Sequence, residues 1–259
     1  MDPQRKKEAS LWNRILDTLS HLFYEGFKSL VLTIVIVIIL RASILEIYKI
    51  PSSTMAPTLY IGDHILVSKL SYGIEIPFSG WFLDSPRKIV EFSKPLRGDV
   101  VAFHLKRDVN RFFIKRIIGL PGDRLSMRQG QPFINGKAVS RVLLKKENHL
   151  ALYQEMAYLI KDNSIDDVKI FQETLPETEH SYLVFSDQRM ARFSEMMEQT
   201  IPEGHVFVLG DNRNELADSR FFGFVPINRI SGKVKWVWLN YSTQNGKFRF
   251  LFRRIGTKI

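Results

Sequence analysis

The 259-residue sequence contains no cysteine, which excludes disulfide bonds, cysteine-ligated metal sites and a cysteine nucleophile. Its six histidines are scattered and form no His-Glu-x-x-His pattern, so no metal site is indicated. The sequence also lacks a Gly-x-Ser-x-Gly element, which leaves a Ser-His-Asp triad without support. It contains no internal repeat and no low-complexity tract. We therefore expect a protein without a metal or a cofactor.

The composition favours a folded chain with an anionic neighbour. Hydrophobic residues make up 45% and charged residues 25% of the sequence, a balance typical of globular rather than disordered proteins. The length suffices for one large core plus an anchor, or at most two domains. The formal net charge of +10 favours contact with nucleic acid or with a phospholipid surface.

One apolar run, Ser29 to Leu40, indicates a membrane anchor. Its twelve uncharged residues would span about 18 Å as a helix, short of the ~30 Å hydrocarbon layer unless the flanks contribute. Apolar residues from Leu22 onward extend it, and we predict a single transmembrane anchor over residues 22–47. The alternatives are a buried core helix and a cleavable signal peptide. Both are weakened because the run starts late and is followed without a break by the motif-bearing region.

Charge near the N-terminus predicts the orientation of this anchor. Residues 1–28 carry Arg5, Lys6, Lys7, Arg14 and Lys28 against Asp2, Glu8, Asp17 and Glu25. Cations in a short leading segment favour the cytoplasmic side, and acidic residues count for little in that rule. We therefore predict a cytoplasmic segment at residues 1–21 and an extracytoplasmic domain at residues 48–259, in the cell membrane.

The region after the anchor reads as mainly β. Short runs rich in Val, Ile, Phe and Trp are separated by Gly-Asp, Pro-Gly-Asp or Asn-Gly signals, and they predict strands. These runs lie at residues 64–67, 99–103, 112–114, 205–209 and 233–238. Asn135-Gly136 predicts a hairpin turn. The pattern is compatible with a partly open β-barrel or sandwich. Residues 137–200 are more polar, and residues 194–198 predict a short helix.

A Pro-bracketed segment with three adjacent hydroxyls, Ile50 to Leu59, is the first candidate for chemistry. Proline disfavours helix at the residue before it, so Ile50 and Ala56 should lie outside helices. A rigid, extended frame around a hydroxyl suits a nucleophile that must meet a carbonyl in a fixed geometry. Considered alone, however, a Ser/Thr-rich turn is usually only a turn.

Three later blocks give this segment its meaning. They are residues 97–103 (RGDVVAF), 113–123 (FIKRIIGLPGD) and 210–226 (GDNRNELADSRFFGFVP). With the anchor and residues 50–59, the ordered blocks resemble those of type I signal peptidases. These are membrane-anchored proteases with a Ser/Lys dyad that remove signal peptides from exported proteins. The resemblance implies a partly open β-barrel catalytic domain in which residues 137–200 are a variable, non-catalytic insertion.

By this resemblance Thr54 is the nucleophile and Lys115 the general base. The family usually has serine at the first position, and threonine keeps the hydroxyl but adds a methyl beside it. Burial among apolar neighbours could lower the pKa of Lys115 far enough for it to act as a base. Arg116, next to it, would then point to water. The Ser52 hydroxyl and the Thr54 N–H would form the oxyanion hole, whereas Ser53 would point to the opposite face.

Other residues match the support of the family's site. Gly210 and Asp211 match the strand end that lines the site, and Asp218 and Arg220 match a structural ion pair behind it. Leu216 departs from the family, which commonly has a serine there to orient the lysine amine, and leucine cannot accept that hydrogen bond. Glu215, if turned inward, would stabilise the charged amine.

The resemblance also implies a substrate site that accepts small residues, typically alanine, at the first and third positions before the cut. The matching apolar positions are Tyr48, Ile50, Met55, Leu59, Ile65, Phe113 and Ile114. Signal peptides of exported preproteins and membrane phospholipid are the expected partners. We expect a monomer that binds no nucleic acid.

Two other readings stay open on the sequence. Thr54 and Leu216 are compatible with a paralogue of weak or no catalysis that binds exported peptides. The basic charge and the alternating aromatic and cationic residues at 247–254 are compatible with a membrane-tethered module that binds lipid or nucleic acid, although such a segment is more commonly an edge strand. Self-cleaving repressors share a Ser/Lys dyad but would need a helix-turn-helix where the apolar run lies, and we exclude them.

Overall fold

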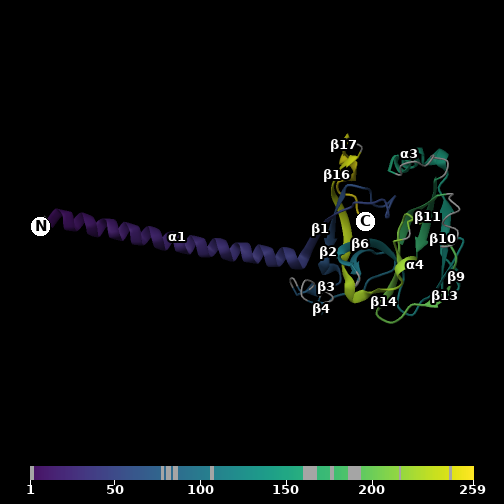
Figure 1. Ribbon diagram of the computed structural model, residues 1–259, viewed down its shortest axis with the longest axis horizontal. Coiled ribbons are helices and arrows are strands. Elements are labelled where there is room, and N and C mark those ends of the chain that lie inside the picture. The colour runs from purple at the N-terminus through teal and green to yellow at the C-terminus, as the bar shows by residue number, and fades with distance from the viewer. Residues whose placement is uncertain are drawn as a thin grey trace. The chain divides into compact units, whose positions relative to one another are not determined.

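The computed structural model describes residues 3–76, 79, 83, 87–105, 108–159, 168–175, 178–185, 194–215, 217–244 and 247–259. The chain divides into two compact units, Met1–Ser43 and Ile44–Ile259 (Figure 1). The first consists of one long helix, and the second is built mainly of strands. The predicted fold class, mainly β after one N-terminal apolar helix, is confirmed.

Helix α1 extends from Pro3 to Ile44. The segment Thr18–Ile38 of this helix has 21 residues and a mean hydropathy of 1.6, and none of its apolar window is buried. By length and composition this segment could cross a membrane. Such a stretch is about 32 Å long as a helix, close to the ~30 Å hydrocarbon layer. Within this segment, Lys28 forms an ion pair of 3.2 Å with Glu25. Residues 45–47, at the end of the predicted anchor segment, pair in a strand of the second unit.

The largest sheet carries most of the predicted strands. Its order is β1 (Leu45–Lys49), β2 (Asp63–Ser68), β16 (Ile230–Gln244), β5 (Val100–Leu105), β6 (Asp108–Gly119), β14 (His205–Leu209) and β15 (Val225–Pro226). Strand β17 (Lys247–Phe250) pairs with β16, so the alternating segment at 247–254 begins as an edge strand. The neighbouring strands are antiparallel. All five runs predicted as strands lie in or overlap strands of this sheet.

Three smaller sheets complete the second unit. They are β13 (Met196–Thr200), β7 (Arg124–Arg128), β8 (Gln131–Ile134) and β9 (Lys137–Ala138); β10 (Ser140–Leu143), β11 (Val168–Leu175) and β12 (Thr178–Phe185); and β3 (Gly73–Glu75) with β4 (Lys88–Glu91). The α-helices described here are α3 (Leu150–Leu159) and α4 (Ser219–Phe222), and short 3₁₀ turns lie at Lys69–Ser71, Lys146–Asn148, Ile227–Arg229 and Phe252–Arg254. Figure 1 shows β1, β2 and β16 at one side of this unit and β10 and β11 at the other.

Two local predictions in this region have different outcomes. The Asn135-Gly136 hairpin is confirmed: both residues have positive φ, 52° and 79°, as the tight turn between β8 and β9 requires. The helix predicted at 194–198 is wrong, because Met196–Thr200 forms β13 and pairs with β7. A five-residue segment nucleates helix poorly, and cross-strand hydrogen bonds to β7 are available instead.

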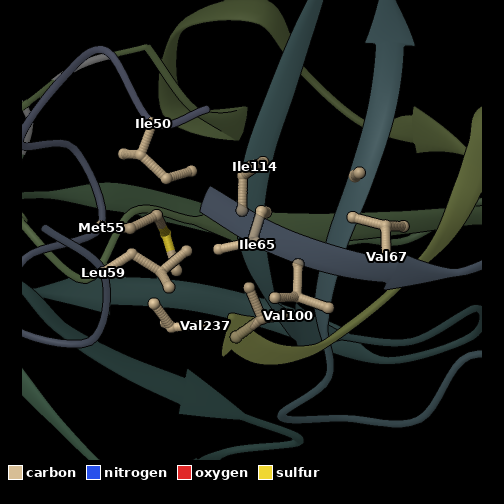
Figure 2. Packing of buried hydrophobic residues seen from close by; sticks show 10 residues of the cluster. Ile50, Met55, Leu59, Ile65, Val67, Val100, Ile114 and Val237 are labelled. Carbon is tan, nitrogen blue, oxygen red and sulfur yellow. The ribbon is translucent and has the colours of Figure 1, made fainter. Parts of the chain in front are cut away.

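The core joins the hydroxyl segment to the large sheet. Ile50, Met55 and Leu59 from that segment pack with buried residues of β2, β5, β6 and β16 (Figure 2). A second cluster, under β5, β6 and β14, includes Ile117 of β6. Ile114 belongs to the first cluster and Ile117 to the second, so β6 is held by apolar packing along its length.

Candidate active site

The hydroxyl segment leaves β1 and is fixed at both ends by backbone hydrogen bonds. The Ile50 N–H donates to the Asp63 carbonyl at 2.8 Å, and the Leu59 N–H donates to the Met55 carbonyl at 2.9 Å. Ile50 and Ala56 lie outside helices, as predicted. The frame is not extended, however, because residues 54–58 form turns that bury Met55 beneath them. Burial of this side chain provides the rigidity that we expected from an extended chain.

Two hydroxyls of the segment lie side by side. The Ser52 Oγ and Thr54 Oγ1 atoms are 3.3 Å apart, and both side chains are partly buried. A hydrogen bond of this length leaves both oxygens within reach of a ligand in the adjoining cleft.

Lys115 is buried in β6, as predicted, with 2% of its surface exposed. Burial lowers the pKa of Lys115 from 10.5 to about 8, while the charges of Asp218, Asp211 and Glu215 oppose the change and that of Arg220 supports it. An amine with this pKa is neutral in about a tenth of the molecules at pH 7, far more than an ordinary lysine.

Gly210 follows β14 and lies close to both the hydroxyl segment and the lysine. A Cβ at this position would lie 2.7 Å from the Thr54 carbonyl oxygen and 3.7 Å from the Lys115 Nζ atom. The Asn212 N–H donates to the same Thr54 carbonyl at 3.1 Å. Glycine therefore allows the strand end, the hydroxyl segment and the amine to approach one another closely.

A cleft of about 360 Å³ opens at these groups. Its lining consists of Ile50, Pro51, Ser52, Thr54, Met55, Phe112, Phe113, Ile114, Lys115 and Ala217. Thr54 and Lys115 thus face one cavity whose walls are otherwise largely apolar. A cavity of this size and character suits a few small apolar side chains in an extended peptide.

The predicted substrate-site residues divide into two groups. Ile50, Met55, Phe113 and Ile114 line the cleft. Leu59 and Ile65 are fully buried in the core beneath it, and the Tyr48 ring packs on Phe112 with 4.1 Å between the ring centroids. The sequence analysis missed Pro51, Phe112 and Ala217. All three adjoin residues that we named, but the resemblance assigned none of them to the substrate site.

The predicted ion pair between Asp218 and Arg220 is present at 2.7 Å. The Asp218 carboxylate also accepts a hydrogen bond of 3.2 Å from the Gly210 N–H. The Arg220 guanidinium donates to the carbonyls of Arg213 and Glu215 at 2.8 and 2.9 Å. This pair therefore holds the loop after β14 in place behind the cleft. Leu216, the second departure from the family pattern, lies outside the described residues.

The expectation that Arg116 points to water is wrong. This residue is 5% exposed, and its guanidinium donates to both Asp211 carboxylate oxygens, at 2.9 and 2.7 Å, and to the Gly98 carbonyl at 2.9 Å. Burial would raise the pKa of Asp211, but the Arg116 charge holds it below its usual value. Adjacent residues of a strand face opposite sides. Arg116 therefore points away from Lys115, and on that side it meets the buried Asp211 carboxylate instead of water.

A hydroxyl and a buried amine of lowered pKa, facing one apolar cleft, are the equipment of a hydrolase that uses lysine as its base. In this protein they belong to a β-domain that follows a helix of membrane-spanning length. The chain belongs to the signal peptidase family, peptidase S26, whose family model matches residues 23–239. Membership in this family makes the protein a protease.

Two relatives identified by sequence agree with this assignment. The chain is 34% identical over 248 residues to signal peptidase I of Pseudomonas fluorescens, covering 91% of this chain and 79% of that protein. It is 33% identical over 224 residues to signal peptidase I of Rickettsia typhi, covering 83% and 80%. A crystal structure of a signal peptidase I from Enterococcus faecalis is 27% identical, covers 55% of this chain and 97% of that one, and has a TM-score of 0.31.

Proposed function

We propose that this protein removes N-terminal signal peptides from exported precursors, cutting after small residues of the Ala-x-Ala type. The relatives named signal peptidase I support the reaction. The mainly apolar lining of the cleft supports the preference, because a cavity of about 360 Å³ has room for small side chains next to the peptide backbone.

In the proposed mechanism Thr54 and Lys115 act on the scissile peptide bond. The neutral Lys115 amine takes the proton of the Thr54 hydroxyl as its oxygen attacks the carbonyl carbon. The Ser52 hydroxyl and the Thr54 N–H stabilise the resulting oxyanion. The tetrahedral intermediate then expels the new N-terminal amine of the mature protein, which receives the proton from Lys115. Water, activated by the same amine, hydrolyses the ester left on Thr54.

The observation that carries this proposal is the state of Lys115. A lysine in a strand usually extends to solvent, but this one is buried at the cleft and its pKa is lowered to about 8. Burial of a lysine amine is unfavourable for folding. An amine kept in this environment beside a hydroxyl therefore favours a peptidase over a paralogue that only binds peptides.

The proposal is tested with the purified full-length chain in detergent and a precursor that bears an Ala-x-Ala site. We expect cleavage at that site by the parent and none by Thr54→Ala or Lys115→Ala. Ser53→Ala and Lys169→Ala are matched controls that remove a neighbouring hydroxyl and an exposed strand lysine. Both controls should cleave like the parent. No cleavage by a folded parent, or equal cleavage by Lys115→Ala, would contradict the proposal.

We further propose that the N-terminus is cytoplasmic and that the protease domain lies outside the cell membrane. The cations that precede the Thr18–Ile38 segment support this orientation. Protease added to intact spheroplasts should then digest the domain that begins near Ile50. Complete protection of that domain, with digestion only after lysis, would reverse the assigned orientation.

A further inference from the structure

The hairpin β11–β12 carries two buried titratable residues that the proposed reaction does not use. Glu173 and His180 are directly opposite each other in the hairpin register. Their exposed fractions are 0% and 7%, and the His180 Nε2 atom is 3.1 Å from the Glu173 carboxylate. Both belong to the segment 137–200, which resembles a variable, non-catalytic insertion. Buried charges need a partner, and the partner here lies outside the hairpin.

That partner is Arg213, in the loop that follows β14. Its guanidinium donates to the Glu173 carboxylate at 2.6 and 3.4 Å and lies 4.1 Å from the centroid of the Tyr182 ring of β12. Burial, the largest single effect, would raise the pKa of Glu173, but the Arg213 charge and the hydrogen bonds from His180 and Arg213 together lower it to about 2. Glu173 is therefore charged at every pH at which the enzyme would work.

Arg213 connects this carboxylate to the cleft. The Arg213 Nε–H donates to the Gly210 carbonyl at 3.2 Å. Gly210 is the residue whose backbone lies against the Thr54 carbonyl and the Lys115 amine. A continuous set of contacts thus runs from Glu173 through Arg213 and Gly210 to both proposed catalytic groups.

The same insertion also supports the hydroxyl segment. Ala56 and Tyr60, shortly after Thr54, are buried in one cluster with Tyr153 and Met156 of α3 and with Val168 and Ile170 of β11. The insertion therefore contacts the chain on both sides of the cleft, through apolar packing at the hydroxyl segment and through an ion pair at the loop after β14.

We propose that Glu173 is a positioning residue of the active site: its carboxylate fixes Arg213, which holds the Gly210 strand end against Thr54 and Lys115. This inference rests on the proposed function. In chemical terms the insertion is then part of the catalytic apparatus, although it supplies no reacting atom.

The surrounding charges explain why the Glu173 carboxylate should matter for the reaction as well as for folding. Arg116 and Arg213 balance Asp211 and Glu173, while burial and the Arg116 charge lower the pKa of His180, which favours its neutral form. The His180 Nε2 atom is 3.9 Å from Asp211. In the parent, the Asp211 carboxylate holds Arg116 and raises the pKa of Lys115. Without the Glu173 charge, Arg213 is free to turn towards this carboxylate.

Glu173→Gln tests the inference, because glutamine keeps the shape and removes the charge. In the full-length protein in detergent we expect kcat for the precursor to fall at least about tenfold, since small misplacements of reacting groups cost this much or more. KM should stay within about twofold. The acid limb of the pH–rate profile should move to lower pH, because negative charge is withdrawn from the neighbourhood of Lys115. Glu147→Gln, which neutralises an exposed carboxylate of the same insertion, should match the parent.

A double-mutant cycle identifies the route of the effect. If Glu173 acts through Arg213, then Glu173→Gln combined with Arg213→Met should be no slower than Arg213→Met alone. Should Glu173→Gln fail to fold, Glu173→Asp retracts the carboxylate from Arg213 by one methylene, and its kcat should fall several-fold at unchanged KM. A folded variant of Glu173 with the parent's kcat and pH profile, or effects that simply add in the cycle, would overturn the inference. A parent that cleaves no precursor would instead refute the proposed function.

Discussion

Replacing Lys115 by methionine should abolish cleavage and, at the same time, stabilise the folded protein at neutral pH. The lysine is 2% exposed, and burial accounts for most of the lowering of its pKa. Folding must therefore remove a charged amine from water, or remove its proton. Methionine fills a similar unbranched volume without that requirement, so the variant should lose the base and gain stability.

The size and sign of this gain follow from linkage. The pKa of Lys115 is 10.5 before burial and about 8 in the fold, a difference worth about 3 kcal/mol at ~1.4 kcal/mol per pH unit. Between these two pH values the folded state binds fewer protons than the unfolded state, so stability rises with pH across that window. Below about pH 8 the full penalty applies. Lys115→Met should thus be more stable than the parent by up to about 3 kcal/mol near pH 7, and the advantage should vanish as the pH approaches 10.5.

Arg116 provides the contrasting control. Its partner Asp211 is 0% exposed and accepts two hydrogen bonds from the guanidinium. Arg116→Met would leave this buried carboxylate without its guanidinium partner, and breaking a buried ion pair in this way typically costs about 3–5 kcal/mol. Neighbouring cations of one strand should therefore show opposite effects on stability. Lys169→Met, at an exposed strand position, should change stability little.

The assay is denaturant unfolding of the full-length variants in detergent, at neutral pH and near the upper end of the pH window, together with precursor cleavage. The argument fails if Lys115→Met is less stable than the parent at neutral pH. It also fails if the variant's advantage is the same at both pH values, because a buried lysine of lowered pKa cannot produce that result. Cleavage by the methionine variant would remove Lys115 from the mechanism.

Three further predictions concern the rate of cleavage. For the parent, kcat/KM should rise with pH through about 8, where Lys115 loses its proton; a flat profile across that range would contradict its role as the base. Gly210→Ala should lower kcat about 10²-fold, because its Cβ would lie 2.7 Å from the Thr54 carbonyl oxygen; a parent-like rate in single-turnover cleavage would be inconsistent with this contact. Thr54→Ser combined with Leu216→Ser should process precursor faster than either single change, since each departure from the family pattern costs ~1–3 kcal/mol of transition-state stabilisation. A double variant as inactive as Thr54→Ala would show that neither the threonine methyl nor the orientation of the Lys115 amine limits the rate.

Local patterns were sufficient to predict most of the fold. The runs at 64–67 and 205–209 became β2 and β14 because β-branched and aromatic residues between turn signals suit strands. The Asn135-Gly136 turn depends only on its own backbone preferences. The failure at 194–198 has a non-local origin, since the partner strand of Met196–Thr200 is β7, about seventy residues earlier in the chain.

The candidate site shows the same limit. Burial of Lys115 could be expected from its apolar neighbours in the strand, and the cleft does bring it together with Thr54. The buried partner of Arg116 could not be expected, because Asp211 is separated from it by 95 residues. Glu173 and His180 lie in a polar segment that resembles a variable, non-catalytic insertion, and only the folded chain shows that Glu173 contacts both His180 and Arg213.

Arg220 has a consequence for how this enzyme can change over time. Its guanidinium ties together the Arg213 and Glu215 carbonyls and the Asp218 carboxylate, on either side of position 216. Those bonds involve backbone atoms and an acidic side chain, none of them from residue 216. A single guanidinium therefore holds residues 213, 215 and 218 together, in the loop from which Ala217 reaches the cleft. Substitutions in this loop should therefore be tolerated over time only where Arg220 and Asp218 are kept, because loss of the Arg220 guanidinium would release two carbonyls and a carboxylate at once.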